Sequence, residues 1–329
     1  MSMAGGALGL ALVERVSAPL VLAQADVDEL RLNFDESSVL LLNVILALIM
    51  FGVALDIRVE DFRQALKTPR GPAIGLVAQF LLLPAGTFAL TRILDPHPSI
   101  ALGMILVASC PGGNMSNFIT HVASGNTVLS IGMTAISTSA AVVMTPLNLA
   151  FWGSLHPDTA ALLREVAVNP AQMFITIGLL LGVPVALGAF TQWRKPALAR
   201  KLRTPMRRGA VGVFIVFLVV ALAANFEYFL EYVGLVVFAV FLHNAFALAA
   251  GYTSARALRL PRRDARAISI EVGIQNSALG LALIFAFFGG LGGMALVAAW
   301  WGIWHIIAGL SLAWLWARRP TAPAVVGVS

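Results

Sequence analysis

The chain has 329 residues, of which 59% are hydrophobic and 12% are charged, a charged share about half that of soluble domains. This composition excludes an ordinary soluble fold and a disordered chain, and the single cysteine, Cys110, excludes an internal disulfide. The net charge of +6 comes from basic residues that lie between long uncharged runs, which indicates membrane topology and not a nucleic-acid surface.

The first 36 residues are expected to form an external, partly ordered segment. They hold an apolar stretch of only 11 residues, followed by Glu14 and Arg15. Residues 23–25, Ala-Gln-Ala, resemble a signal-peptidase site, but no basic region precedes the apolar stretch. A cleaved signal, a degenerate helix and an interfacial helix therefore stay open as interpretations.

Beyond residue 36, long runs without acidic or basic residues predict an all-α polytopic membrane protein. A helix needs about 20 apolar residues to cross a bilayer. The backbone must be hydrogen-bonded internally in lipid, and the runs do not alternate as barrel strands do. Two runs have room for two spans each, and the last contains one charge, so nine transmembrane helices are expected. The runs are residues 37–55, 71–91, 96–157, 166–193, 209–226, 232–255 and 267–317.

The positive charges indicate which side each loop faces. With nine spans, one set of loops holds 18 of the 22 basic residues. Cytoplasmic loops carry the excess of Lys and Arg. This places the N-terminus outside and the C-terminus in the cytoplasm, with residues 318–329 as a disordered cytoplasmic tail. The expected location is a bacterial inner membrane.

A polar cluster interrupts the 96–157 run. Residues 110–117 read Cys-Pro-Gly-Gly-Asn-Met-Ser-Asn, in which Pro-Gly-Gly breaks a helix and Asn and Ser supply polar ligands. A second break at residues 124–126 makes the piece between a half-helix. Ser130 and Thr134 follow at i, i+4, on one helical face. Single Ser and Thr residues often only pack helices together, but the whole constellation favours a site.

A second polar cluster interrupts the last run. Residues 271–277 read Glu-Val-Gly-Ile-Gln-Asn-Ser, and Glu271 is the one carboxylate in that run. Ionisable residues inside a membrane are costly and mark functional sites. A broken helix that lines a cavity explains this string. The alternative is that Glu271 lies near the interface and pairs with Arg266.

The two clusters occupy corresponding places in the two halves of the chain. Each follows a span with a lone amide, Gln79 in the first half and Asn244, beside His243, in the second. Interrupted helices at corresponding places are typical of transporters built on inverted repeats. The oxygen ligands of Ser, Thr, Asn, Gln and one Glu suit Na⁺, and there is no soft sulfur cluster.

The sequence offers little support for other classes. It lacks a His-Glu-x-x-His run and a Walker-type Gly-Lys-Ser/Thr, so a metalloprotease or an ATP-driven pump lacks its residues. No nucleophile–base pair is visible, and we expect no enzymatic activity. No protein partner is indicated. His305, in the last span, either lines the cavity or packs within the bundle.

These motifs resemble the bile acid:sodium symporter family. The resemblance rests on residues 110–117, on Gly125-Asn126 with Ser130 and Thr134, and on residues 271–277, and it runs from about residue 38 to 316. Residues 50–52 (Met-Phe-Gly), Gln79 and the His243-Asn244 pair agree. Two positions depart from some relatives, Asn114 in place of threonine and Ile306 in place of asparagine.

The resemblance implies two sodium sites, a substrate site, and two discontinuous helices that cross near the bilayer middle. The first sodium site would use Ser116, Asn117, Ser130, Thr134 and Glu271. The second would use Gln79, Glu271 and Gln275 with the carbonyls of Val272 and Ile274. Substrate would meet Asn114, Met115, Asn276, Ser277 and His305.

The resemblance also implies two structural parts within a membrane domain of residues 37–317. A panel would comprise residues 37–56, 166–193 and 209–226. A core would comprise residues 71–92, 96–157, 232–255 and 264–317.

The expected function is sodium-coupled import of an organic anion, a bile acid or a small carboxylate such as pantoate or a 2-oxo acid. An alternative is a carrier of an arsenite-like oxyanion that uses the Cys110 thiolate, or a proton-coupled anion carrier. A third is a sensor that binds anion and Na⁺ without transport.

Overall fold

The computed structural model describes residues 36–55, 58–113, 115–166, 170–206 and 226–318, with residues 209, 212 and 216 between them. Residues 1–35 of the expected external segment 1–36 and most of the expected span 209–226 lie outside the described residues. Within the described part the chain is helical and has no β-strand. The predicted helical membrane protein is confirmed at this level, while the count of nine spans stays a prediction.

Four of the described helical stretches are long and apolar enough to cross a membrane. Each has 22 to 28 residues and at least an 18-residue window of high hydropathy. Two shorter apolar helices, α6 (Pro98–Ser109) and α14 (Ser277–Phe287), are half-length pieces. The four long stretches are Arg70–Leu94, Thr127–Ser154, Val236–Ala257 and Gly292–Ala317.

The first half of the chain has a long helix, a short one, a break, a short one and a long one. The first long helix contains a π-helical turn, Ala78–Leu82, which is one residue wider than an α-helical turn and carries Gln79. The elements are α4 (Arg70–Val77), the π-helical turn, α5 (Leu83–Leu94), α6, α7 (Met115–Val122) and α8 (Thr127–Ser154).

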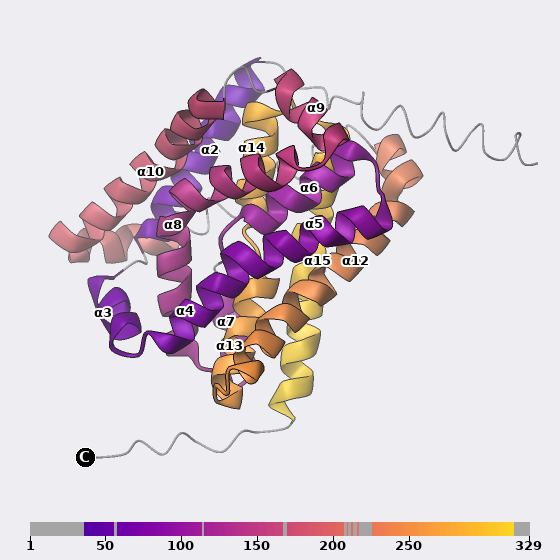
Figure 1. Cartoon of the computed structure of the whole chain (residues 1–329). Helices are drawn as coiled ribbons and strands as arrows, with labels where there is room; N and C mark the ends of the chain where they lie inside the picture. The colour runs from indigo at the N-terminus through magenta and orange to yellow at the C-terminus, as the bar shows by residue number, and fades with distance from the viewer. Residues whose placement is uncertain are drawn as a thin grey trace, which may run out of the picture.

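The second half repeats this order, with α12 (Phe226–Ala257), α13 (Arg262–Gly273), α14 and α15 (Gly292–Ala317). It runs in the opposite direction. In Figure 1 the turn between α12 and α13 lies at the bottom, whereas the turn between α5 and α6 lies in the upper half. The interruptions that the sequence predicts at residues 111–113, at residues 124–126 and within residues 271–277 are present, because residues 110–113, 123–126 and 274–276 lie between helices.

The two central breaks cross and pair with each other. Gly112 and Gln275 form an isolated antiparallel bridge. The backbone N–H of Gly113 donates to the Ile274 carbonyl at 2.6 Å, and that of Asn276 donates to the Pro111 carbonyl at 2.9 Å. Breaking a helix inside a membrane frees backbone groups that lipid cannot satisfy. The two breaks satisfy each other, and the crossing is held at the level where four half-helices end.

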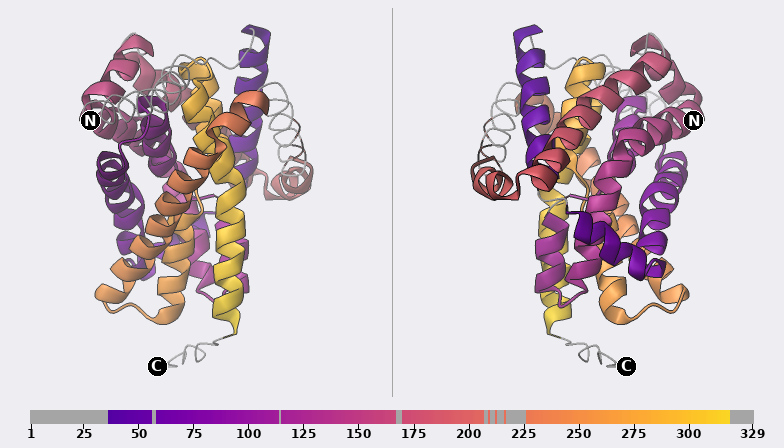
Figure 2. Two further views of the ribbon diagram at one scale, coloured as in Figure 1. Left: turned by 90° about the vertical axis from the view of Figure 1, so that its right-hand side faces the viewer. Right: turned by 90° about the vertical axis from the view of Figure 1, so that its left-hand side faces the viewer.

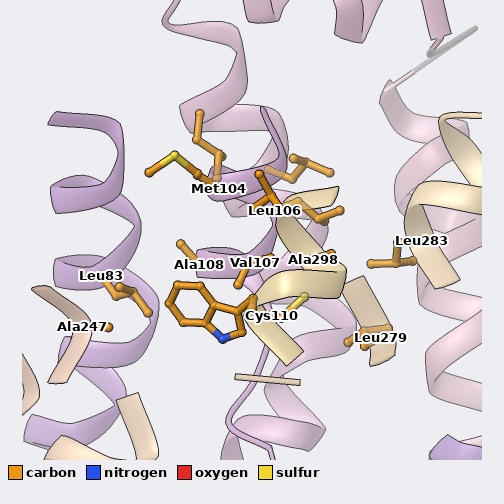
Figure 3. Packing of buried hydrophobic residues seen from close by; sticks show 14 of the residues in the cluster. Leu83, Met104, Leu106, Val107, Ala108, Cys110, Ala247, Leu279, Leu283 and Ala298 are labelled. Carbon is orange, nitrogen blue, oxygen red and sulfur yellow. The ribbon is translucent and has the colours of Figure 1, made fainter. Parts of the chain in front are cut away.

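Buried apolar side chains of α5, α6, α12, α14 and α15 pack together in one cluster (Figure 3). In that view Cys110 lies among Val107, Leu279 and Ala298. Every residue of α6 from Ser99 to Ser109 is buried. A helix that is apolar all round is typical of the centre of a bundle, and α6 takes that place.

The remaining helices lie beside this bundle (Figures 1 and 2). They are α2 (Glu36–Ala54), α3 (Val59–Lys67), α9 (Pro157–Val166), α10 (Pro170–Arg194) and a stretch at residues 196–206. Helices α2 and α10 pack closely at Gly188, where an added Cβ would stand 2.6 Å from the Phe51 carbonyl oxygen. The start of α2 and the end of α15 lie at opposite ends of the molecule.

Candidate functional site

Glu271 lies in the last turn of α13 and is fully buried. Three hydroxyls donate to its carboxylate, from Ser116 at 2.6 Å, Thr134 at 2.7 Å and Ser130 at 3.1 Å. Among the described residues, no lysine, arginine or histidine forms an ion pair with this carboxylate. A buried carboxylate needs opposite charge or strong hydrogen bonds, and here hydroxyls supply the contact.

The sequence places these hydroxyls by helix geometry. Ser116 and Asn117 belong to the first turn of α7, which begins directly after the break that Pro111 and the two glycines make. Ser130 and Thr134 lie one turn apart on α8. Asn126 caps α8, because its side-chain oxygen accepts from the Leu129 N–H at 3.1 Å. The cap fixes where α8 starts and thereby which face carries the hydroxyls.

Oxygen atoms are crowded around Glu271. Besides the carboxylate contacts, Asn117 Oδ1 lies 2.9 Å from Ser130 Oγ and 3.3 Å from Thr134 Oγ1. Thr134 Oγ1 also lies 3.0 Å from the Ser130 carbonyl oxygen. Each hydroxyl has one hydrogen to donate, so there are more short oxygen–oxygen contacts than hydrogens to fill them. Such a set fits a small cation better than it fits hydrogen bonds alone.

Gly112 makes room for the carboxylate. A Cβ added there would stand 2.9 Å from Glu271 Cδ and in closer contact with Oε1. Any side chain at this position would collide with the carboxylate. The glycine pair of the first break therefore both interrupts the helix and allows Glu271 to approach the crossing backbone.

The amides predicted for a second site form a continuous chain. Gln275 Nε2 donates to the Val272 carbonyl at 2.6 Å. Gln79 Nε2 donates to Gln275 Oε1 at 2.8 Å and to the Cys110 carbonyl at 2.9 Å. The Ile274 carbonyl accepts from Gly113. Gln79 Oε1 is buried without a hydrogen-bond partner in the described structure.

In this second group the backbone carbonyls and the Gln275 side-chain oxygen accept hydrogen bonds from amide N–H groups, whereas Gln79 Oε1 does not. The carbonyls of Val272 and Ile274 and the side chains of Gln79 and Gln275 lie together, next to Glu271 in α13. A cation there would replace amide donors, and the unpartnered Gln79 Oε1 is a ligand without a present role. The donor set fits a hard monovalent cation.

The described residues among those predicted for substrate are either half-buried or buried. Met115 and Asn276 are half-buried at the crossing, where Asn276 Oδ1 caps α14 by accepting from the Leu279 N–H at 3.1 Å. Ser277 begins α14 and is buried. His305 is buried on α15, and its Nδ1 has no partner within the described structure. Asn114 lies outside the described residues.

The alternative pairing of Glu271 with Arg266 is wrong. Arg266 donates to the Ala123 carbonyl at 2.8 Å, and its guanidinium lies 5.6 Å from the Trp316 ring centroid. It thereby binds the C-terminal end of α7, where cations are favoured. Glu271 takes its hydrogen bonds from the hydroxyls of α7 and α8.

One buried contact was not expected from the sequence. Thr87 Oγ1 lies 2.7 Å from His243 Nε2, and the His243 ring contacts the Trp301 ring at a tilt of 57° with centroids 4.6 Å apart. Trp301 in turn meets His305 edge-on at 6.5 Å. A histidine beside a polar neighbour in an apolar span was a usable signal, but its partners lie on two other helices.

A transition-metal site finds no support in the described residues. No group of three or more His, Cys, Asp or Glu side chains could hold a metal ion there. The Cys110 thiol is free and fully buried. The candidate site is therefore a hydroxyl, amide and carboxylate centre.

Comparison with known proteins identifies the family of the chain. The model of the sodium bile acid symporter family matches residues 43–232, more than half of the chain. The chain belongs to the sodium bile acid symporter family. The predicted resemblance is confirmed, and the prediction that the chain is not an enzyme agrees with membership in a family of transporters.

Several relatives align over most of the chain. An uncharacterized sodium-dependent transporter, YocS, of Bacillus subtilis is 33% identical over 84% of this chain and 83% of its own length. The probable chloroplastic sodium/metabolite cotransporter BASS1 of Arabidopsis thaliana is 33% identical over 83% of this chain and 66% of its own length. The human ileal sodium/bile acid cotransporter is 28% identical over 72% and 67%. The family member described here is thus an integral membrane protein of a sodium-dependent transporter family.

Proposed function

We propose that the chain is a sodium-coupled symporter that imports a small organic anion by alternating access. The observation that carries this proposal is the oxygen-crowded, buried carboxylate of Glu271, which three hydroxyls contact within 3.1 Å. A cation bound there offsets the charge of a carboxylate that is costly to hold inside a membrane.

Two sodium sites would share Glu271. The first would use Ser116, Asn117, Ser130 and Thr134, whose oxygens already surround one side of the carboxylate. The second would use Gln79 and Gln275 with the carbonyls of Val272 and Ile274. Sodium would replace the amide N–H groups on those oxygens. Because the ligands come from both breaks, sodium binding would draw the two crossing segments together.

The anion would bind where the breaks cross. The N-termini of α7 and α14 meet there, and a helix N-terminus carries partial positive charge that attracts anions. Asn114, Met115, Asn276, Ser277 and His305 would line this site. Bile acids and small carboxylates such as pantoate or a 2-oxo acid are the candidate substrates.

Transport would follow from movement between two parts within residues 37–317. A panel of residues 37–56, 166–193 and 209–226 would move against a core of residues 71–92, 96–157, 232–255 and 264–317. The close contact of α2 with α10, and the pairing of the two breaks within the proposed core, support this division. The N-terminus would lie outside and the C-terminus in the cytoplasm of a bacterial inner membrane.

Sodium dependence of ligand binding is the experiment that tests this function. The purified protein would be heated with bile acids, pantoate and 2-oxo acids, in NaCl and in choline chloride. A ligand that binds only the folded state raises its stability. We expect one anion class to raise the melting temperature in NaCl alone, and Glu271→Gln to remove that effect.

Transport itself is tested in proteoliposomes. An inward sodium gradient should drive uptake of the stabilising anion in the wild type and not in Glu271→Gln. Stabilisation by arsenite, or uptake driven by a proton gradient without sodium, would instead favour the oxyanion or proton-coupled alternatives. Binding without uptake would favour a sensor.

A further inference from the structure

Asn244 closes the end of a half-helix. It lies on α12, is fully buried, and donates from Nδ2 to the carbonyl of Gly273 at 2.8 Å. Gly273 is the last residue of α13. The last carbonyls of a helix have no donor within it, and inside a membrane each one left unpaired is costly. Asn244 supplies that donor from a different helix.

Gln79 makes the same contact in the first half of the chain. It is also fully buried, and its Nε2 donates to the Cys110 carbonyl, the residue that follows the end of α6. The donor and acceptor are 31 residues apart in the first half and 29 in the second. In both halves a side-chain amide on the long helix therefore holds the end of the following short one.

The acceptors fix how both amides are turned. A backbone carbonyl can only accept, so the nitrogen of each amide must face it. The oxygens then point elsewhere, and Gln79 Oε1 and Asn244 Oδ1 are both buried without a partner in the described structure. Gln79 is one methylene longer than Asn244 and reaches on to Gln275 in the opposite break.

Asn244 acts on the carbonyls beside its own acceptor. Three successive carbonyls at the end of α13 have three different donors, because Val272 accepts from Gln275, Gly273 from Asn244 and Ile274 from Gly113. Peptide planes are rigid. Holding the Gly273 carbonyl therefore limits the directions of the carbonyls on either side of it.

We propose that Asn244 is a positioning residue of the second sodium site, in the place that Gln79 occupies in the first half of the chain. This rests on the proposed function, because the carbonyls of Val272 and Ile274 are its expected ligands. Asn244 acts through them by fixing the end of α13.

The test compares sodium binding among four proteins. The melting temperature is measured at increasing NaCl without anion, with choline chloride as the control salt, and gives the sodium concentration that produces half of the maximal stabilisation. The four proteins are the wild type, Asn244→Leu, Asn244→Gln and Asn148→Leu. Leucine keeps the branched shape of asparagine in a somewhat larger side chain and removes the donor, whereas glutamine keeps a donor. Asn148 is a matched control, because it is a buried asparagine whose Oδ1 accepts from Trp152 on its own helix at 3.1 Å.

We expect Asn244→Leu to need about tenfold more sodium, the change that loss of one hydrogen bond produces. Asn244→Gln should recover most of the affinity, and Asn148→Leu should match the wild type. The affinity for the anion at saturating sodium should be nearly unchanged in all four. A folded Asn244→Leu with wild-type sodium affinity would overturn the proposal, as would an equal change in Asn148→Leu.

Two provisions keep the test decisive. Should Asn244→Leu not fold, Asn244→Ser retains a shorter donor and should show an intermediate loss of sodium affinity; a wild-type value overturns the proposal. A wild type indifferent to sodium would overturn the proposed function and this proposal together, whereas a sodium-dependent wild type with an unchanged variant overturns this proposal alone.

Discussion

Ser130 and Thr134 lie one helical turn apart on α8, and their hydroxyls contact the same two acceptors, the Glu271 carboxylate and Asn117 Oδ1. A single rigid helix thus sets both hydroxyls at once. The acceptors come from two different half-helices, α7 and α13. The face of α8 that carries Ser130 and Thr134 therefore joins the two halves of the chain at the carboxylate.

A glycine at position 112 should be as important for sodium binding as the ligands themselves. Gly112→Ala puts a Cβ 2.9 Å from Glu271 Cδ, so the carboxylate must move. Overpacking of this kind costs about 1–3 kcal/mol. We expect a lower melting temperature in choline chloride and loss of the further stabilisation by NaCl.

The control for this variant is Gly234→Ala on α12, where an added Cβ meets nothing within 4 Å. It should behave as the wild type in both salts. A Gly112→Ala protein with wild-type stabilisation by NaCl would show that the carboxylate position does not govern sodium binding.

The Cys110 thiol should neither react with reagents in the folded protein nor contribute to sodium binding. Its thiol is fully buried among apolar side chains, and the site uses its backbone carbonyl, which accepts from Gln79. Cys110→Ala should therefore retain sodium-dependent stabilisation and lose about 1 kcal/mol of stability from the small cavity. The folded wild type should not react with a maleimide, as mass spectrometry would record.

The same variant separates the arsenite alternative from the symporter. Stabilisation of the wild type by arsenite, lost in Cys110→Ala, would count for an oxyanion carrier. Rapid maleimide labelling of the native protein would show that the thiol is reachable, against its buried position.

Arg266 should contribute to stability through the end of α7. Arg266→Gln removes the charge that faces the Trp316 ring and weakens the hydrogen bond to the Ala123 carbonyl. Hydrogen bonds from charged groups contribute about 1.5–3 kcal/mol, so a clear fall in melting temperature is expected. Sodium affinity should change little, since Glu271 takes its contacts elsewhere.

The comparison for that variant is Arg194→Gln. Arg194 is exposed and lies 5.0 Å from the centroid of its neighbour Trp193. Contacts between exposed charged and aromatic side chains contribute little to stability, so the melting temperature should stay near that of the wild type. Equal effects of the two variants would contradict a special role for Arg266.

The breaks and the first polar centre were predictable from the sequence. Proline and glycine mark the interruption at residues 111–113, and a cluster of polar side chains inside an apolar run favours a site over helix packing alone. The i, i+4 spacing of Ser130 and Thr134 predicts a shared face whatever the tertiary structure. The breaks and the shared face depend on local chemistry, whereas the gathering of these hydroxyls around Glu271 was implied by the family resemblance.

Contacts between distant faces were not predictable in the same way. Thr87 and His243 are 156 residues apart, and Asn244 and Gly273 belong to different helices. Periodicity gives the buried face of each helix but not which faces meet. The π-helical turn at Ala78–Leu82 contains no glycine or proline, and the nearest signal is Pro84, which cannot donate to the carbonyl of Phe80 four residues earlier. Proline indicates a disturbed helix there but does not specify a π-turn.

That π-helical turn determines toward which side of the first long helix each later side chain points. Gln79 and Thr87 are eight residues apart, which is about 80° around an ordinary α-helix of 3.6 residues per turn. The one extra residue absorbed by a π-turn brings the two to within about 20° of each other. Both are fully buried, one facing the crossing and the other facing His243. A deletion of one residue within the turn would leave the two residues seven apart on a regular helix, still within about 20° of each other. Such a shortened helix would therefore keep Thr87 directed at His243 while it loses the wide turn that carries Gln79.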